Sequence, residues 1–134
     1  MPPARSTGVP PSPELVGTVI AGRGLGRALG APTANIALPG VRPALYGSYA
    51  AIARVRDRVR PALAHVGVRP SIGGTEPLLE VHLLDFDGDL YGVTMHVRLL
   101  HKVSDEMALV SSALLRRKIA DDVRRVRAFF RHGG

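Results

Sequence analysis

The sequence predicts a mostly β fold, a small antiparallel barrel or sandwich with one C-terminal helix packed on it. Two observations predict this class. Short runs that alternate apolar and polar side chains, separated by turn signals, are typical of strands. Near residue 112 the apolar residues change to a helical period. With 134 residues, 46% of them hydrophobic, the chain is long enough for one domain with one core.

The N-terminal segment differs in composition from the rest of the chain. Residues 1–14 are rich in proline and small polar residues, which predicts a disordered or extended lead-in. The folded domain is therefore expected over residues 15–134. Its first strand is predicted at 15–20, before a glycine-rich loop.

Two strands and a loop are expected in the middle of the chain. The alternation over 49–55 predicts a strand, and the polar pair at 57–58 predicts a turn. Residues 61–68 are expected to form the returning strand. Residues 69–77 contain two prolines and two glycines, and so predict a loop.

A hairpin is predicted next, because Asp87-Gly88 is a strong turn signal between two alternating runs, 78–85 and 91–100. The first run places Glu80 and His82 on the face opposite the apolar residues. The final helix is predicted from apolar residues at helical spacing, with Ser112 as a possible cap: Leu115, Ile119, Val123, Val126 and Phe130.

Composition limits the classes of function. The formal charge of +7 favours phosphate-bearing ligands. The absence of cysteine excludes disulfides, thiolate chemistry and cysteine metal sites, and a cytoplasmic location is the default expectation. No apolar run is long enough to cross a bilayer, so no membrane partner is expected. The arginines of the last helix lie opposite its apolar stripe, and aromatic residues are few, so nucleic acid is not an expected partner. The protein is expected to be a monomer.

The glycine-rich segment 22–30 is the first candidate binding element. It fits neither a Walker loop nor a dinucleotide-binding fingerprint, because the required spacings are missing. Its glycines would still let backbone N–H groups approach a phosphate, with Arg23 and Arg27 adding charge. The alternative, a flexible connection between strands, is equally compatible with this composition.

Thr33 and Asn35 form the second candidate, since side chains two apart on an extended segment point the same way. Their hydroxyl and amide oxygens are ligands suited to Mg²⁺, and Pro32 would stiffen the segment. A turn in which both side chains satisfy backbone groups is the alternative, and turns of that kind are frequent.

Glu80 is the third candidate, because it lies within an apolar strand beside His82. Partial burial would make its carboxylate a stronger proton acceptor. The alternative is an exposed strand residue without a chemical role.

Taken in order, five elements resemble one family. These are PTAN at 32–35, GSYA at 47–50, HVGVRPS at 65–71, LLEVHLLDFDGDLYG at 78–92 and the terminal helix. The set resembles the riboflavin kinase domain, usually the C-terminal half of a bifunctional riboflavin kinase/FAD synthetase in bacteria. The resemblance covers about residues 15–127.

The resemblance implies a six-stranded antiparallel Greek-key β-barrel with the helix packed outside. It implies ATP- and Mg²⁺-dependent phosphorylation of the 5′-hydroxyl of riboflavin, which gives FMN. Glu80 would be the catalytic base, and Thr33 and Asn35 would hold the metal. The nucleotide would contact a loop that includes Gly22, Arg23, Gly24, Gly26, Arg27 and Pro32.

The sequence departs from the family pattern at several positions. His65 replaces an asparagine, Ser48 replaces the valine of a Gly-Val-Tyr element, and Ser104 replaces an arginine. Ser104 belongs to the expected flap beside the flavin, together with Glu106, Met107 and Leu109, the last in place of an aromatic residue. A repurposed enzyme acting on another small molecule, or a non-catalytic flavin- or nucleotide-binding module, is therefore the alternative.

Overall fold

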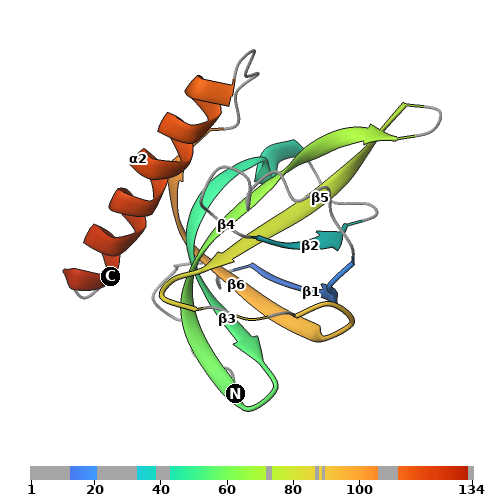
Figure 1. Ribbon diagram of the computed structural model, residues 1–134, viewed down its shortest axis with the longest axis horizontal. Coiled ribbons are helices and arrows are strands. Elements are labelled where there is room, and N and C mark those ends of the chain that lie inside the picture. The colour runs from blue at the N-terminus through green and yellow to red at the C-terminus, as the bar shows by residue number, and fades with distance from the viewer. Residues whose placement is uncertain are drawn as a thin grey trace, which may run out of the picture.

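The computed structural model describes residues 13–20, 33–38, 43–71, 74–86, 88, 90–105 and 112–132. It confirms the predicted fold class, since six antiparallel strands form a nearly closed barrel with one helix beside it (Figure 1). Among these residues, no helix combines the length and apolar character needed to cross a membrane.

The strands form one sheet in the order β1-β6-β3-β4-β5-β2. The elements are β1 (Glu14–Thr18), β2 (Ala34–Ala37), the 3-10 helix η2 (Pro43–Leu45), β3 (Gly47–Val55), β4 (Arg58–Ser71), β5 (Gly74–Leu83), β6 (Thr94–Ser104) and α2 (Ser112–Arg131).

The two edge strands, β1 and β2, face each other and almost close the barrel. The Ile20 N–H donates to the Asn35 carbonyl oxygen at 2.7 Å, in an isolated antiparallel bridge. Gly17 of β1 makes this approach possible, because a Cβ at that position would overlap the side chain of Ile36. Of the predicted lead-in, residues 1–14, positions 1–12 lie outside the described residues. Glu14 is the first residue of β1, and the Pro13 carbonyl accepts a 2.8 Å hydrogen bond from the Leu99 N–H.

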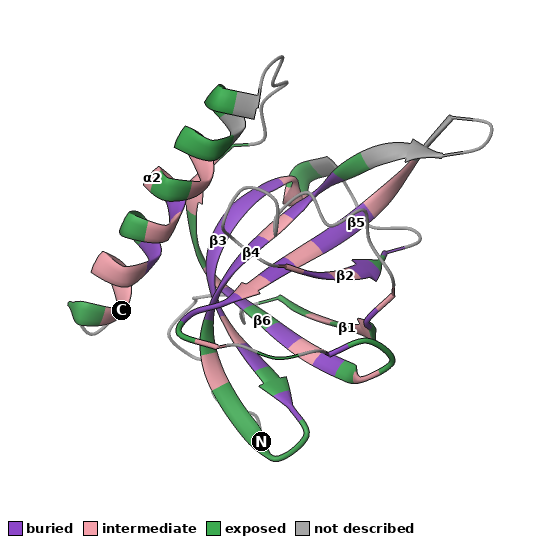
Figure 2. Cartoon of the chain, viewed as in Figure 1, coloured by how far each residue is buried: buried purple, intermediate pink, exposed green. Residues whose placement is uncertain are grey.

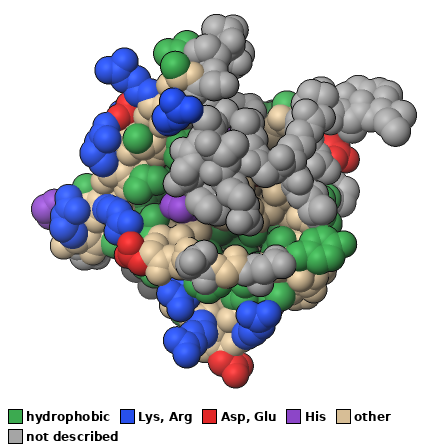
Figure 3. All heavy atoms as spheres, viewed as in Figure 1, with side chains coloured by type: hydrophobic (Ala, Val, Ile, Leu, Met, Phe, Trp, Pro, Cys, Tyr) green, Lys and Arg blue, Asp and Glu red, His purple; other side chains and the backbone are tan. Residues whose placement is uncertain are grey.

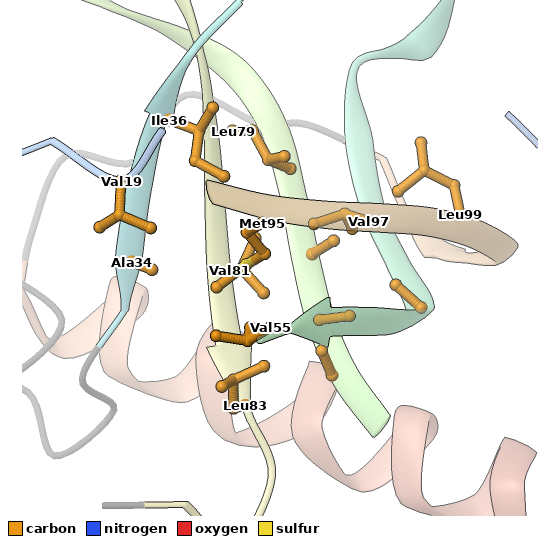
Figure 4. Packing of buried hydrophobic residues seen from close by; sticks show 14 of the residues in the cluster. Val19, Ala34, Ile36, Val55, Leu79, Val81, Leu83, Met95, Val97 and Leu99 are labelled. Carbon is orange, nitrogen blue, oxygen red and sulfur yellow. The ribbon is translucent and has the colours of Figure 1, made fainter. Parts of the chain in front are cut away.

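Among the described residues, the core cluster inside the barrel consists of hydrophobic side chains. Alternate residues of each strand point inward, as the period of two requires. Figure 4 shows the interior side chains packed together, among them Ile36, Leu79, Val81, Met95, Val97 and Leu99. The predicted inward face of β5 and β6 is confirmed, and Glu80 and His82 lie on the opposite, outer face.

The predicted hairpin between 78–85 and 91–100 is wrong. β5 pairs with β4 and β2, whereas β6 pairs with β1 and β3. The connection between β5 and β6 therefore crosses from one part of the sheet to another. A local turn signal does not determine which strands pair, because pairing depends on contacts far apart in the sequence.

Hydrogen bonds to the end of β1 explain this crossing. The Val19 N–H donates to the Val93 carbonyl oxygen, and the Gly92 N–H donates to the Val19 carbonyl oxygen, both at 2.9 Å. Leu90 is buried in the core beside them. These contacts direct the chain towards β1, where β6 then begins.

The predicted loop at 69–77 is also wrong, because β4 extends to Ser71 and β5 begins at Gly74. Pro70 pairs with Thr75 in this outer part of the hairpin, and Val68 pairs with Pro77. The β4–β5 hairpin projects beyond the barrel at upper right in Figure 1. Cross-strand pairing has overridden the local proline and glycine signals.

Helix α2 covers one part of the outer barrel surface. Val126 is fully buried and packs in a second cluster with Ala50, Leu63 and Leu84. Figure 2 shows the buried part of α2 on the side that faces the strands. The His101 ring stacks on Phe129, with ring centroids 5.3 Å apart. The helix therefore lies against β3, β4 and β6, while β1 and β2 lie away from it.

Candidate functional site

A row of polar residues crosses the outer surface of the barrel. In strand register, Asn35 of β2 faces Glu80 of β5, which faces His65 of β4; His65 faces Ser48 of β3, which faces Ser104 of β6. Residues directly opposite one another share a face of the sheet. The fold thus places residues from five strands in one line.

At the β2 end of the row lie the candidate metal ligands. Ala34 and Ile36 are buried in the core, so Asn35 between them points outward. Thr33 immediately precedes β2, and both Thr33 and Asn35 are half-buried. The spacing puts their oxygens on one side of an extended backbone, and a hydroxyl with an amide oxygen fits a hard cation such as Mg²⁺.

Glu80 lies beside these ligands. Its neighbours Leu79 and Val81 are buried in the core, and Glu80 itself is half-buried on the outer face. Directly opposite residues on antiparallel strands have Cβ atoms about 5 Å apart. A carboxylate at that distance from Asn35 is close enough to accept a proton from a hydroxyl group held near a metal at Asn35.

The other end of the row lies under α2. The Lys118 ammonium donates to Ser48 Oγ at 3.2 Å, Ser104 Oγ at 3.0 Å and Asp122 Oδ2 at 2.7 Å. Asp122 also accepts from Arg125 through Oδ1 at 3.2 Å, so both carboxylate oxygens are bound. The side chain of Lys118 is 12% exposed and that of Asp122 is 3% exposed. A paired, nearly buried cation therefore anchors this end of the row.

His65 joins the two ends. Its Nδ1 lies 3.0 Å from Ser48 Oγ, and its strand position is directly opposite Glu80. In the sequence, His65 stands out as a departure from the family pattern. The structure shows that this position lies between the anchored serine and the candidate base.

A bidentate ion pair attaches α2 to the end of β5. Arg127 donates to both oxygens of Asp85, at 3.2 and 2.9 Å. These hydrogen bonds, and then the charge of Arg127, lower the pKa of the Asp85 carboxyl below its usual 3.8. The same contacts raise the pKa of Arg127. The pair is exposed and lies apart from the polar row.

Not every predicted site residue is described. Outside the described residues lie the predicted nucleotide loop (Gly22, Arg23, Gly24, Gly26, Arg27 and Pro32) and three flap residues (Glu106, Met107 and Leu109). Ser104 is the last residue of β6 and belongs to the polar row. The Lys102 ammonium pairs with Asp105 at 3.2 Å and lies over the Tyr49 ring.

Lys118 and Asp122 were not among the predicted site residues, since only the arginines of this helix were assigned to its polar face. A signal was available, because Lys118, Asp122 and Val126 are four residues apart and so lie on one side of the helix. A charged pair in line with a buried valine predicts a covered ion pair.

Positive charge gathers in two places on the surface. Figure 3 shows Lys and Arg side chains along α2 at the left and around the β3–β4 turn at the bottom. The turn carries Arg54, Arg56 and Arg58, all exposed. Both groups lie away from Asn35 and Glu80.

The chain resembles curated enzymes that are considerably longer. It is 39% identical over 118 residues to the bifunctional riboflavin kinase/FMN adenylyltransferase of Haemophilus influenzae, and 38% identical over 117 residues to that of Escherichia coli. Each match covers 87% of this chain but only 38% and 37% of the relative. A third relative, the RNA-binding riboflavin kinase RibR of Bacillus subtilis, is 35% identical over 81% of this chain and 47% of that protein. The chain thus spans less than half the length of each of these relatives.

A solved structure and a family model also match the chain. A Streptococcus pneumoniae structure titled macrolide-efflux protein matches with a TM-score of 0.73 and 28% identity, over 87% of this chain and 38% of that one. The family model for riboflavin kinase, or flavokinase, matches residues 10–130. The chain therefore belongs to the riboflavin kinase family.

Proposed function

We propose that this protein transfers the γ-phosphate of ATP to the 5′-hydroxyl of riboflavin and so forms FMN. The observation that carries the proposal is the register of β2 and β5, which puts Glu80 directly opposite Asn35. One strand then supplies oxygen ligands, and its neighbour supplies a carboxylate that can accept a proton.

In this reaction Glu80 takes the proton of the riboflavin 5′-hydroxyl. At the same time the hydroxyl oxygen bonds to the γ-phosphorus of ATP, and the bond between that phosphorus and the ADP oxygen breaks. The half-buried position limits competition from water for the carboxylate. The rigid strand pairing keeps the carboxylate fixed relative to Asn35, which reduces the entropy lost on reaching the transition state.

Thr33 and Asn35 are the residues that would hold Mg²⁺. Bound there with the nucleotide, Mg²⁺ would offset the negative charge that develops on the transferred phosphoryl group. The protein contributes two neutral oxygen ligands, which leaves the other coordination positions of the ion for phosphate oxygens and water.

The test is the direct reaction. Purified protein is incubated with riboflavin, ATP and Mg²⁺, and the flavins are separated by chromatography. We expect FMN in an amount equal to the ADP formed, and no FMN when EDTA removes the metal. Protein that binds Mg-ATP but forms no FMN would contradict the proposal.

The expected flap motivates one rival function. Ser104 stands where the family pattern has arginine, and a serine has neither the charge nor the planar donor geometry of a guanidinium. Phosphorylation of another hydroxyl-bearing molecule, with riboflavin inactive as acceptor, would favour a repurposed enzyme over riboflavin kinase.

A further inference from the structure

All three ammonium hydrogens of Lys118 have acceptors within the protein. An ammonium group has three, and three oxygens accept them: Ser48 Oγ, Ser104 Oγ and Asp122 Oδ2. The ion pair with Asp122 is nearly buried, so this arrangement is held in place by packing as well as by charge. Ser48 is itself only 2% exposed. Its hydroxyl oxygen is therefore fixed as an acceptor from Lys118.

The contact with Lys118 favours Ser48 as a donor to His65, because one lone pair of its oxygen is already used. Because the Ser48 oxygen accepts from Lys118, its own hydrogen is available for Nδ1 of His65, 3.0 Å away. A ring nitrogen that accepts a hydrogen bond carries no hydrogen, so the proton of a neutral His65 lies on Nε2. The contact thus favours one tautomer of the ring.

The strand register indicates which residue the Nε2–H of His65 lies towards. Ser48 faces His65 from β3 on one side, and Glu80 faces His65 from β5 on the other. All three residues share the outer face of the sheet. A ring whose Nδ1 is bound on the β3 side has Nε2–H as its remaining donor, and Glu80 is its cross-strand neighbour towards β5.

We infer that His65, held in the Nε2–H tautomer by Ser48 and Lys118, is a positioning residue that orients the Glu80 carboxylate. The inference rests on the proposed function, in which Glu80 is the base. Ser48, His65 and Ser104 are also positions at which the sequence departs from the family pattern. In the structure these three departures meet around one lysine of α2. They form a linked set in which Lys118 brings a positive charge next to position 104.

The first experiment does not depend on activity. Nitrogen-15 NMR of histidine-labelled protein reports the tautomer of each ring, and the His65 signals are assigned by their loss in His65→Ala. We expect Nε2–H in the unsubstituted protein. We also expect Glu80→Gln to shift the His65 Nε2 signal, and Ser48→Ala to weaken the tautomer preference. An Nδ1–H tautomer, or an Nε2 chemical shift that is unchanged in Glu80→Gln, would overturn the inference.

The second experiment is a double-mutant cycle in the FMN-forming assay. Ser48→Ala is expected to lower kcat roughly tenfold, with the KM values for ATP and riboflavin within about twofold. Because Ser48 acts through His65, the double variant Ser48→Ala/His65→Ala should be no slower than His65→Ala alone. Additive losses, or an unchanged kcat in Ser48→Ala, would overturn the inference.

Ser104 supplies the matched comparison, because it accepts from the same ammonium but has no contact with His65 among the described hydrogen bonds. The effect of Ser104→Ala on kcat should add to the effect of His65→Ala.

If Ser48→Ala does not fold, Ser48→Cys takes its place, since cysteine keeps the volume of the side chain and hydrogen-bonds poorly. If the unsubstituted protein forms no FMN, the proposed function fails, and the NMR result alone decides whether His65 is coupled to Ser48 and Glu80.

Discussion

The two ends of the polar row lie on the same face of the sheet, but their surroundings differ. At the β3 and β6 end, Ser48 and Asp122 are each 2% exposed, under α2. At the β2 and β5 end, Asn35 and Glu80 are half-buried and lie away from the helix. The helix therefore divides one continuous row into a covered end and an accessible end.

The difference shows how one sheet face serves two purposes. Polar groups at the covered end have fixed partners within the protein, which stabilises the packing of the helix. Polar groups at the accessible end can contact a ligand. This comparison predicts that substitutions at the covered end change stability first, whereas substitutions at the accessible end change activity first.

The largest expected effect is at the covered end. Asp122→Ala leaves the Lys118 ammonium nearly buried without its counter-ion, and we expect the free energy of unfolding to fall by about 3 kcal/mol or more. Urea denaturation measures this. The control is Asp121→Ala, the neighbouring aspartate, whose side chain is 34% exposed and pairs with Arg124; a loss below about 1 kcal/mol is expected there. Equal losses would mean that coverage by the helix does not matter.

The next effect tests the accessible end. Glu80→Gln keeps the shape of the side chain but removes the proton acceptor, so kcat should fall about 100-fold, equivalent to roughly 2.7 kcal/mol. The midpoint of urea denaturation should change little. Glu76→Gln, on the same face of β5, is the control and should keep kcat. Normal turnover by Glu80→Gln would show that Glu80 is not the catalytic base.

A smaller effect concerns the apolar contact that holds the helix. Val126→Ala removes two methyl groups from a fully buried side chain, at a cost of about 1.5 kcal/mol in unfolding free energy. KM and kcat should stay near their original values, since Val126 packs against Ala50, Leu63 and Leu84 under the helix. A large fall in kcat at unchanged stability would indicate that the helix acts directly on the accessible end.

The smallest effect concerns the exposed pair of Asp85 and Arg127. The pKa of Asp85 is lowered in the folded protein, so the unfolded chain binds the proton more readily. The stabilisation is therefore present above about pH 4 and is lost as the pH falls through the lowered pKa. Asp85→Asn suits the test, because asparagine tolerates the positive φ of 56° at this position. The two proteins should differ slightly in stability at pH 6 and converge near pH 2; a difference that persists at pH 2 would contradict the ion-pair origin.

Local patterns predicted five of the six described strands and the helix, but they missed β2 and the strand pairing over 69–77. The alternation over 78–83 placed Glu80 on the outer face, and the helical period placed Val126 against the barrel. The pairing of β5 and β6 was predicted wrongly, because Asp87-Gly88 is only a local signal. Contacts to Val19, far away in the sequence, determine where β6 runs.

The candidate site was predictable in part. The sequence predicted Thr33 and Asn35 as one candidate and Glu80 as another, but the proximity of Asn35 and Glu80 depends on which strands pair and in what register. The network around Lys118 needed the packing of α2 on the sheet, which no local pattern specifies. His65 could be noticed as unusual, yet its position between Ser48 and Glu80 follows only from the register of β4.

The bridge from Ile20 to Asn35 has a consequence for hydrogen exchange. Strand β1 pairs with β6 along one side, and on its other side this single bridge reaches β2. Edge strands of this kind open at a lower free-energy cost than the central strands. A ligand held by Asn35 would oppose the opening, because the carbonyl of the same residue accepts the Ile20 N–H. Amide protons of β1 should therefore exchange more slowly with deuterium as ligand is added, although β1 contributes no residue to the row.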